Sequence, residues 1–356
     1  MQRTISIIGI IFILLLSSLS YSTIGTDETT SSLIYVDDDN ISGPWDGSEE
    51  HPYKTIIEGV TASVDGDTVF VYSGSYDDFE ILINTSIDLI GEDKESTIIE
   101  EGQIILFRGE ESSISGFSLN NCLIESEHQN HMEIFDNNIL GEIYITGSNT
   151  SLIYHNNISY TNKNYQSIGI RVSDDSTVNI EHNVISNESI GIRLWSNNGK
   201  ILNNTIKDNE EGIFIYGNNN LISDNIILNN KGGEEKGYGI YINGVNNIIT
   251  RNHLAYNYYG IKIEAENGNE ITKNNFIGNV RHVNLKGSLR GYNNHWDKNY
   301  WSGSLFRGLL PKLLFGIGFG MVPIPGPGDL IFWIPWFSIE IQFDWHPAKE
   351  PYDITI

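Results

Sequence analysis

Disulfide bonds cannot stabilise this chain from within, because it contains a single cysteine, Cys122. Basic residues are also scarce: 21 Lys and Arg stand against 46 Asp and Glu, which gives a formal net charge of −25. A charge of this sign repels nucleic acid and anionic lipid at long range, and no basic stripe in the sequence offsets it. We therefore expect no nucleic-acid partner.

Long uninterrupted apolar runs are missing as well. The run near the N-terminus, Ile5 to Leu16, is short for a membrane-spanning helix. It follows Arg3 and precedes the small-residue segment Ser20-Tyr21-Ser22, which predicts a signal peptide over residues 1–22 and a flexible linker over residues 23–32. An uncleaved anchor is the alternative, and it would be one route to a membrane. We expect an exported protein in an extracellular, cell-surface or periplasm-like location.

What the chain does contain is a repeat of the form Gly-Ile-x-Ile, followed about a dozen residues later by Asn-x-Ile. The phrase begins at Gly169, Gly191, Gly212, Gly239 and Gly260, so its glycines advance by 22, 21, 27 and 21 residues. A period near 22 residues indicates one solenoid turn per repeat. The apolar residues alternate within each phrase, which is typical of strands, so we predict a parallel β-helix.

The β-helix is predicted to occupy residues 33–302, with early strands at 33–36, 68–71, 81–83, 87–90 and 104–107. Pro52 to Ser63 is predicted to form a short helix, with Ile56, Ile57 and Val60 on one face, that caps the first coil. Residues 303–356 are apolar and rich in proline and glycine at first, and their prolines would break a membrane helix. We predict that they pack over the other end as a C-terminal cap; docking on a partner or membrane is the alternative.

The repeat also predicts which side chains point inward. Within one coil Ile192, Leu194, Ile201 and Ile206 are expected to point into the core, whereas Arg193, Trp195 and Lys207 point out. An asparagine precedes each inward Ile or Leu of the Asn-x-Ile phrase. We expect it to adopt the left-handed backbone of a tight turn, and stacked asparagines to share amide hydrogen bonds.

Several segments resemble a known family. They are Tyr35-Val36-Asp37-Asp38-Asp39, Pro52-Tyr53-Lys54-Thr55-Ile56, Asp65-Gly66-Asp67-Thr68-Val69 and Leu89-Ile90-Gly91-Glu92, which are similar to archaeal exported right-handed β-helix proteins. The coils and the ending Asn299-Tyr300-Trp301-Ser302 resemble the broader group of NosD β-helix proteins and carbohydrate-binding and sugar-hydrolase repeats. This resemblance implies a right-handed, pectin-lyase-like solenoid. It leaves the activity open, since the fold hosts lyases, hydrolases, epimerases, adhesins and scaffolds.

The sequence does not identify a catalytic residue. Asp174-Asp175 is the carboxylate pair within a regular coil, but neighbouring strand residues face opposite ways, and a turn before Ser176 accounts for both. Asp174, Glu264 or an arginine are the candidate proton acceptors for a lyase or hydrolase.

Two groups of residues could bind a metal. Cys122, His128, His131 and Met132 lie close in sequence and together suit copper. Asp136, His155 and His182 precede the turn asparagines of consecutive coils and should stack. A polar loop and a surface ladder, which continues as Asn203, Asp224, Arg251 and Lys273, are the alternatives. We expect no cofactor, with copper or calcium as the open alternatives.

The outward residues of the Gly-Ile-x-Ile strands suggest a binding surface. They are Tyr144, Arg171, Arg193, Phe214, Tyr241 and Lys262, one per coil, with Trp195 and Tyr216 two residues further along. Aromatic rings stack on sugars and arginine pairs with carboxylates. Insertions at 160–167 and 231–236 fall beside this face. The alternative is aromatic pairing that only stiffens the sheet.

These observations predict an exported protein that binds polysaccharide or another glycoconjugate on this face, with an acidic glycan favoured, without cutting it. The alternatives are a polysaccharide lyase or hydrolase, a NosD-like copper-binding accessory protein, and a structural surface scaffold or adhesin.

Overall fold

The computed structural model describes residues 31–100, 104–107, 111–160, 166–173, 176–232, 236–264, 268–286, 293–303, 312–325 and 331–354. The predicted signal peptide, residues 1–22, and nearly all of the predicted linker lie outside these ranges. So do Asp174 and Asp175. Among the described residues no helix is long and apolar enough to cross a membrane.

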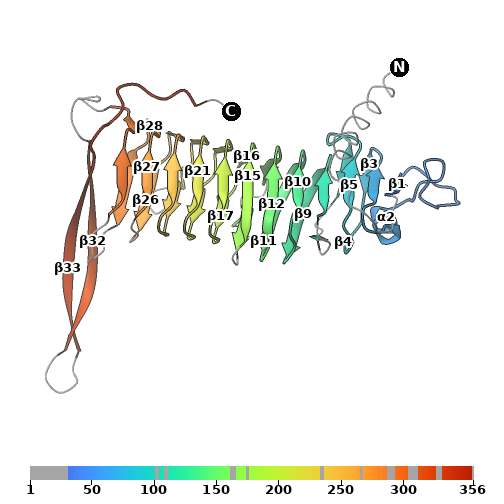
Figure 1. Ribbon diagram of the computed structural model, residues 1–356, viewed down its shortest axis with the longest axis horizontal. Helices are drawn as coiled ribbons and strands as arrows, with labels where there is room; N and C mark the ends of the chain where they lie inside the picture. The colour runs from blue at the N-terminus through green and yellow to red at the C-terminus, as the bar shows by residue number, and fades with distance from the viewer. Residues whose placement is uncertain are drawn as a thin grey trace, which may run out of the picture. The chain divides into compact units, whose positions relative to one another are not determined.

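The chain winds into coils whose strands form three parallel sheets (Figure 1). The first sheet contains, in spatial order, β1 (Leu33–Val36), β2 (Thr68–Val71), β5 (Asp88–Gly91), β8 (Ser113–Ser115), β10 (Glu133–Phe135), β12 (Asn149–Tyr154), β15 (Thr177–Glu181), β18 (Lys200–Leu202), β21 (Leu221–Ser223), β24 (Ile248–Thr250), β27 (Glu270–Thr272) and β30 (His295–Asp297), followed by β33 (Ile331–Asp344) and β32 (Lys312–Pro325). Each strand from β1 to β30 pairs in parallel with its equivalent in the next coil.

The second and third sheets share two long strands, β9 (Ser118–Glu127) and β11 (Asn138–Thr146). The second sheet also contains β3 (Gly74–Tyr76), β6 (Thr97–Ile99), β13 (Asn157–Ser159), β16 (Val184–Ser186), β19 (Thr205–Lys207), β22 (Ile226–Leu228), β25 (His253–Ala255), β28 (Asn275–Ile277) and β31 (Tyr300–Trp301). The third contains β4 (Glu80–Ile83), β7 (Ile104–Phe107), β14 (Ile168–Ser173), β17 (Ile190–Leu194), β20 (Glu211–Ile215), β23 (Tyr238–Ile242), β26 (Tyr259–Glu264) and β29 (Arg281–Lys286). All the Gly-Ile-x-Ile phrases therefore lie in the third sheet.

The core consists of apolar rows that run along the axis. Ile170 pairs with Ile192, Ile192 with Ile213, Ile213 with Ile240 and Ile240 with Ile261, and all five are fully buried. The prediction of one inward row is confirmed. Each coil has only a few apolar side chains and cannot bury them by itself. Stacking the coils buries this apolar surface between neighbours.

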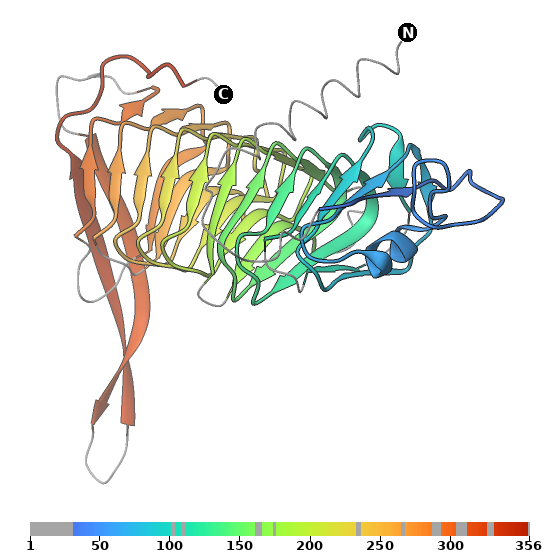
Figure 2. The ribbon, with the colours of Figure 1, turned by 45° about the vertical axis from the view of Figure 1, so that its right-hand side comes forward.

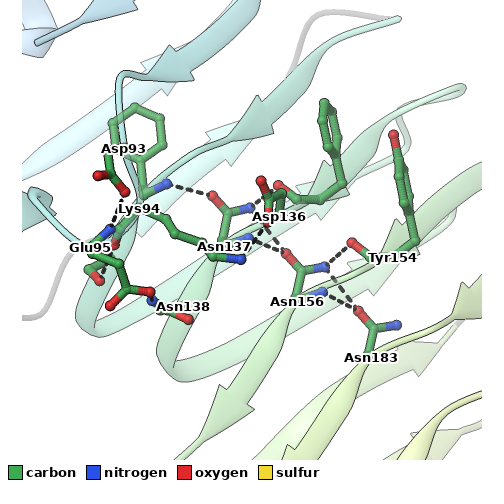
Figure 3. A network of polar contacts seen from close by, with 12 residues as sticks. Asp93, Lys94, Glu95, Asp136, Asn137, Asn138, Tyr154, Asn156 and Asn183 are labelled. Atoms are coloured by element: carbon green, nitrogen blue, oxygen red, sulfur yellow. Dashed lines mark hydrogen bonds and ion pairs between the residues drawn. The ribbon is translucent and has the colours of Figure 1, made fainter. Parts of the chain in front are cut away.

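A ladder of buried asparagines runs along the turn between the first and second sheets. It consists of Asn137, Asn156, Asn183, Asn204, Asn225, Asn252, Asn274 and Asn299. Each backbone N–H and each Nδ2 donates to the Oδ1 of the next asparagine, at 2.9 to 3.1 Å. Figure 3 shows the first three members. The predicted amide ladder is thus present.

We predicted the left-handed backbone conformation at these asparagines, and that prediction was wrong. The left-handed conformation belongs to the preceding residue, which is Asp136, His155, His182, Asn203, Asp224, Arg251, Lys273 or Lys298, with φ between 51° and 58°. The bend comes one residue early because the asparagine must keep its side chain inside the turn. There its Nδ2 also donates to main-chain carbonyls, such as that of Ile134 for Asn156.

The N-terminal helix is shorter than predicted. It spans α2 (Ile56–Ala62), begins with a capping box between Thr55 and Glu58, and lies beside the first coils (Figure 2). Ile56 and Val60 are buried as expected, but Ile57 is exposed. The N–H groups of Ile56 and Ile57 donate to the carboxylate of Asp78, which fixes the start of the helix.

Beyond the last coil, β32 and β33 form an antiparallel hairpin that projects away from the coils in Figures 1 and 2. The predicted cap over residues 303–356 is therefore not confirmed in that form. The closing contacts that the structure describes come from residues 344–354: Asp344 is buried, and Tyr352 exchanges hydrogen bonds with Asn275.

Candidate functional site

The outer face of the third sheet holds the predicted surface residues in register. In the order of the coils they are Tyr144, Arg171, Arg193, Phe214, Tyr241 and Lys262, each paired with the next. We call these six residues, with Trp195 and Tyr216, the strip. The alternation of each strand places the first six outside because both neighbours of each are apolar and buried.

One part of the strip is open to solvent. Trp195 is 48% exposed and Tyr216 is 41% exposed, and their rings meet edge to face at 5.9 Å. The Arg193 guanidinium lies 5.4 Å from the Trp195 ring, and Phe214 packs 5.0 Å from Tyr216. We call these four residues the open patch. Rings and a guanidinium held side by side can accept the apolar face and the polar edge of one ligand.

At the other end of the strip, the side chains already contact other side chains of the protein. Tyr241 is only 5% exposed and stacks on Phe214 at 4.0 Å, and its hydroxyl donates to Glu264. The ammonium of Lys262 lies 4.6 Å from the Tyr238 ring and 4.9 Å from the Tyr241 ring. At this end the alternative interpretation, side-chain pairing that stiffens the sheet, describes the structure better than an open binding surface.

Three carboxyl groups that the sequence analysis did not single out border the strip. Each interrupts the repeat. Glu142 precedes the inward Ile143, at the position where later coils have the glycine of the Gly-Ile-x-Ile phrase. Glu188 occupies the position of Asn209, Asn230 and Asn257 in the next coils, and Glu211 directly precedes Gly212. Aligning the coils residue by residue would have found them.

Glu142 projects beside Arg171. Their Oε1 and Nε atoms are 2.7 Å apart, and the Arg171 guanidinium also lies 5.2 Å from the Tyr144 ring. Burial raises the pKa of Glu142, while the charges of Arg171 and Arg193 oppose that rise. The arginine thus has two partners within the protein.

Glu188 is the most buried of the three, with 2% exposure. Its backbone N–H donates to Asn209 at 2.9 Å, so it begins a second amide ladder, but among the described residues neither carboxylate oxygen has a hydrogen-bond partner of ordinary geometry. A Cβ on Gly169 would come within 3.4 Å of Glu188 Cγ, so the side chain lies over that glycine. Burial raises the pKa of Glu188 to about 7, an effect that nearby Ser167 opposes and Glu142 reinforces.

Glu211 lies on the same border one coil further. It is buried, and its Oε2 lacks a hydrogen-bond partner among the described residues. Burial raises the pKa of Glu211, and the positive charges of Lys236 and Arg193 oppose that rise. Carboxyl groups with raised pKa values beside arginines are candidates for proton transfer as well as for ligand binding.

The four residues predicted to bind copper do not form one ligand set. Cys122 and Met132 are buried in the hydrophobic core, and the Cys122 thiol points at main-chain carbonyl groups. His128 and His131 are exposed, and His131 contacts Thr150. We predicted one site because the four residues are close along the chain. Side chains of a β-strand alternate between core and surface, so closeness in sequence does not bring these four together.

The other predicted ladder has the expected stacking. The rings of His155 and His182 are 5.3 Å apart, and Asp136 is engaged by Lys94. Within the described ranges, the one cluster of three or more potential His, Cys or carboxylate ligands is Asp37, Asp38 and Asp39, after β1 and far along the chain from the strip. Glu264, a predicted proton acceptor, accepts from Tyr241 and lies 3.7 Å from Lys262.

Comparisons with known proteins agree with this architecture. Residues 98–235 match the model of the right-handed β-helix region, and residues 223–308 match that of the periplasmic copper-binding protein NosD. The NosD-matched segment contains no cysteine or methionine, and its described histidines at 253, 282 and 295 lie in three different sheets, so they do not fit a copper site. Among curated proteins, none matches by sequence.

Two solved structures share the fold at low identity. A mannuronic acid-specific family 6 polysaccharide lyase from human gut microbiota aligns with a TM-score of 0.52 and 13% identity, over 76% of this chain and 80% of that one. The catalytic domain of a GH87 α-1,3-glucanase aligns with a TM-score of 0.58 and 11% identity, over 79% of this chain and 60% of that one. The protein is therefore a right-handed parallel β-helix, built like enzymes that act on polysaccharides.

Proposed function

We propose that this protein is exported and binds an extended polysaccharide along the outer face of the third sheet, without cleaving it. The observation that carries the proposal is the open patch, where Trp195 and Tyr216 stay exposed beside Arg193. Exposed rings on a rigid sheet suit the apolar faces of sugar rings. The fold shared with a polysaccharide lyase and a glucanase supports a glycan partner.

The proposed binding surface is smaller than the predicted strip, because part of the strip already contacts other side chains of the protein. Tyr241 and Lys262 are engaged by Tyr238 and Glu264, and Arg171 is engaged by Glu142. Ligand contacts are thus assigned to the open patch, with Tyr144 and Arg171 beside it. Neighbouring coils are about 4.8 Å apart, so a chain lying along the axis would cross several of them.

The binding proposal is tested with a glycan array and the double variant Trp195→Ala/Tyr216→Ala. Loss of two stacking rings should weaken the Kd of any glycan hit at least about tenfold, measured by calorimetry. Trp345→Ala is the matched control, because that tryptophan is also exposed but lies after β33. Unchanged affinity in the double variant, or no glycan bound at all, contradicts the proposal.

Cleavage is the second candidate function, and Glu142 and Glu211 favour it. A carboxyl group whose pKa is raised by burial can hold a proton for a leaving oxygen, and a second, ionised carboxylate can activate water. Incubating the bound glycan with the protein distinguishes the two functions. New reducing ends or unsaturated sugars would show cleavage, whereas an unchanged glycan supports binding alone.

A further inference from the structure

The positive charges on the outer face are largely compensated within the protein. Arg171 pairs with Glu142 at 2.7 Å, and Lys262 lies 3.7 Å from Glu264 and 3.2 Å from the hydroxyl of Tyr238. Arg193 makes no ion pair with a described residue, yet the carboxyl groups of Glu211 and Glu142 act on it electrostatically. A face of this kind attracts anions less than its arginines suggest.

The balance of charge around the open patch is not positive. Between the coils of Tyr144 and Phe214, the guanidinium groups of Arg171 and Arg193 face the carboxyl groups of Glu142 and Glu211, so the local charges offset one another. The rest of the chain is strongly acidic, with a net charge of −25. An acidic glycan would therefore gain little attraction from the two arginines and would meet long-range repulsion from the chain as a whole, which opposes the preference for acidic sugars predicted from the arginines alone.

One carboxyl group at this border also leaves an acceptor atom without a donor. Among the described residues, the Oε2 of Glu211 lacks a hydrogen-bond partner although it is buried. A buried acceptor without a donor costs about 1–3 kcal/mol. Neutral sugars bring hydroxyl donors, and hydrogen bonds from O–H groups to carboxylates are short and strong. A uronate brings further acceptors and a like charge instead.

We infer that the ligand of this face is a neutral, hydroxyl-rich polysaccharide, and that the carboxyl groups bordering the open patch discriminate against uronates. Trp195 and Tyr216 stack on the sugar rings, Arg193 donates to ring or hydroxyl oxygens, and Glu142 and Glu211 accept from hydroxyl groups. Glu188 is too buried for direct contact. The inference rests on the proposed function and specifies its substrate class.

The test compares oligosaccharide pairs that differ only in oxidation at C6: hexamers of mannose and mannuronate, of glucose and glucuronate, and of galactose and galacturonate. The neutral member of a bound pair should have a Kd at least about tenfold lower, with little change between 50 and 500 mM salt. Tighter binding of the uronate, weakening as salt rises, overturns the inference but leaves glycan binding intact. Binding of no member, neutral or acidic, overturns the proposed function itself and the inference with it.

A charge-neutral variant sharpens the test. Glu142→Gln/Glu211→Gln keeps the shape of both side chains but leaves Arg171 and Arg193 uncompensated, so affinity for the uronate hexamers should rise several-fold. Glu210→Gln is the matched control, since Glu210 neighbours Glu211 but is half exposed and pairs with Lys236 at 3.2 Å. Thermal unfolding of each variant confirms that it folds. If the folded double variant binds uronates no better than the control does, the carboxyl groups do not set specificity and the inference is wrong.

Discussion

At the scale of single residues, the informative positions are those where the repeat is broken. Asparagine at position 188 would extend the ladder that runs through Asn209, Asn230 and Asn257, yet the chain has a glutamate there. Its carboxylate is buried and lacks donors among the described residues. Natural sequences break their own local rules mainly at functional sites, so this departure is consistent with the binding proposed for the open patch.

Glu188 should make stability depend on pH. Its folded-state pKa of about 7 lies above its ordinary value of 4.5, so its contribution is fully present below pH 4.5 and is lost as the pH rises through 7. The loss is at most about 3–4 kcal/mol, since the rise from 4.5 to about 7 is about 2.5 pKa units and each unit is worth about 1.4 kcal/mol. In urea unfolding, Glu188→Gln should therefore match the parent near pH 5 and exceed its stability near pH 8.

Glu210→Gln serves as the control for this measurement because Glu210 is half exposed. Its difference from the parent should be small and equal at both pH values. An equal gain for Glu188→Gln at pH 5 and pH 8 would mean that folding does not raise the pKa of Glu188, contrary to the prediction.

At the scale of elements, the strands are short and the asparagine ladder compensates for this. Many strands contain three residues, among them β18, β21 and β24 in the first sheet, and few ladder hydrogen bonds fit within each. Asn225 adds bonds at the turn: it donates to Asn252 Oδ1 at 2.9 Å and to the Ile201 carbonyl at 2.8 Å. The amides thereby link each coil with the coils on both sides of it.

Replacing Asn225 by alanine should lower the free energy of unfolding by about 2–4 kcal/mol. The substitution removes its own donors and leaves the buried N–H and Nδ2 groups of Asn204 without their acceptor. Lys207→Ala, an outward residue of β19, should change stability by no more than about 0.5 kcal/mol. Equal effects of the two substitutions in urea unfolding would show that the ladder is not a stabilising element.

At the scale of the whole molecule, a solenoid must close its last coil. Asp344 does this by taking the place of the next asparagine: its Oδ2 accepts from Asn299 N at 3.0 Å, from Asn299 Nδ2 at 3.1 Å and from Trp301 Nε1 at 3.0 Å. Burial raises the pKa of Asp344, and these three donors oppose that rise. Repeat proteins need such end contacts because a terminal coil has a neighbour on one side only.

Two substitutions of Asp344 should differ sharply in their effect. Asp344→Asn keeps an acceptor for Asn299 and Trp301 and removes a buried charge, so its melting temperature should stay near that of the parent. Asp344→Ala leaves three buried donors unpaired and should cost about 2–4 kcal/mol, with unfolding of the last coils first. Hydrogen exchange at residues 293–303 reports this directly; unaltered protection there in Asp344→Ala would contradict the role of Asp344 as the end of the ladder.

The sequence by itself determined the parallel β-helix, its inward rows and the register of the strip. These follow from a period near 22 residues and from strict alternation, which are local properties of the chain. It misplaced the left-handed turn residue by one position, because only the packed turn shows that the asparagine keeps its amide inside. Only the tertiary structure decided which outward residues stay open. Tyr241, Lys262 and Arg171 each contact a side chain of a neighbouring coil. Glu188 lies over Gly169 of the preceding coil. Such contacts join residues 19 or more positions apart, and no period in the sequence encodes them.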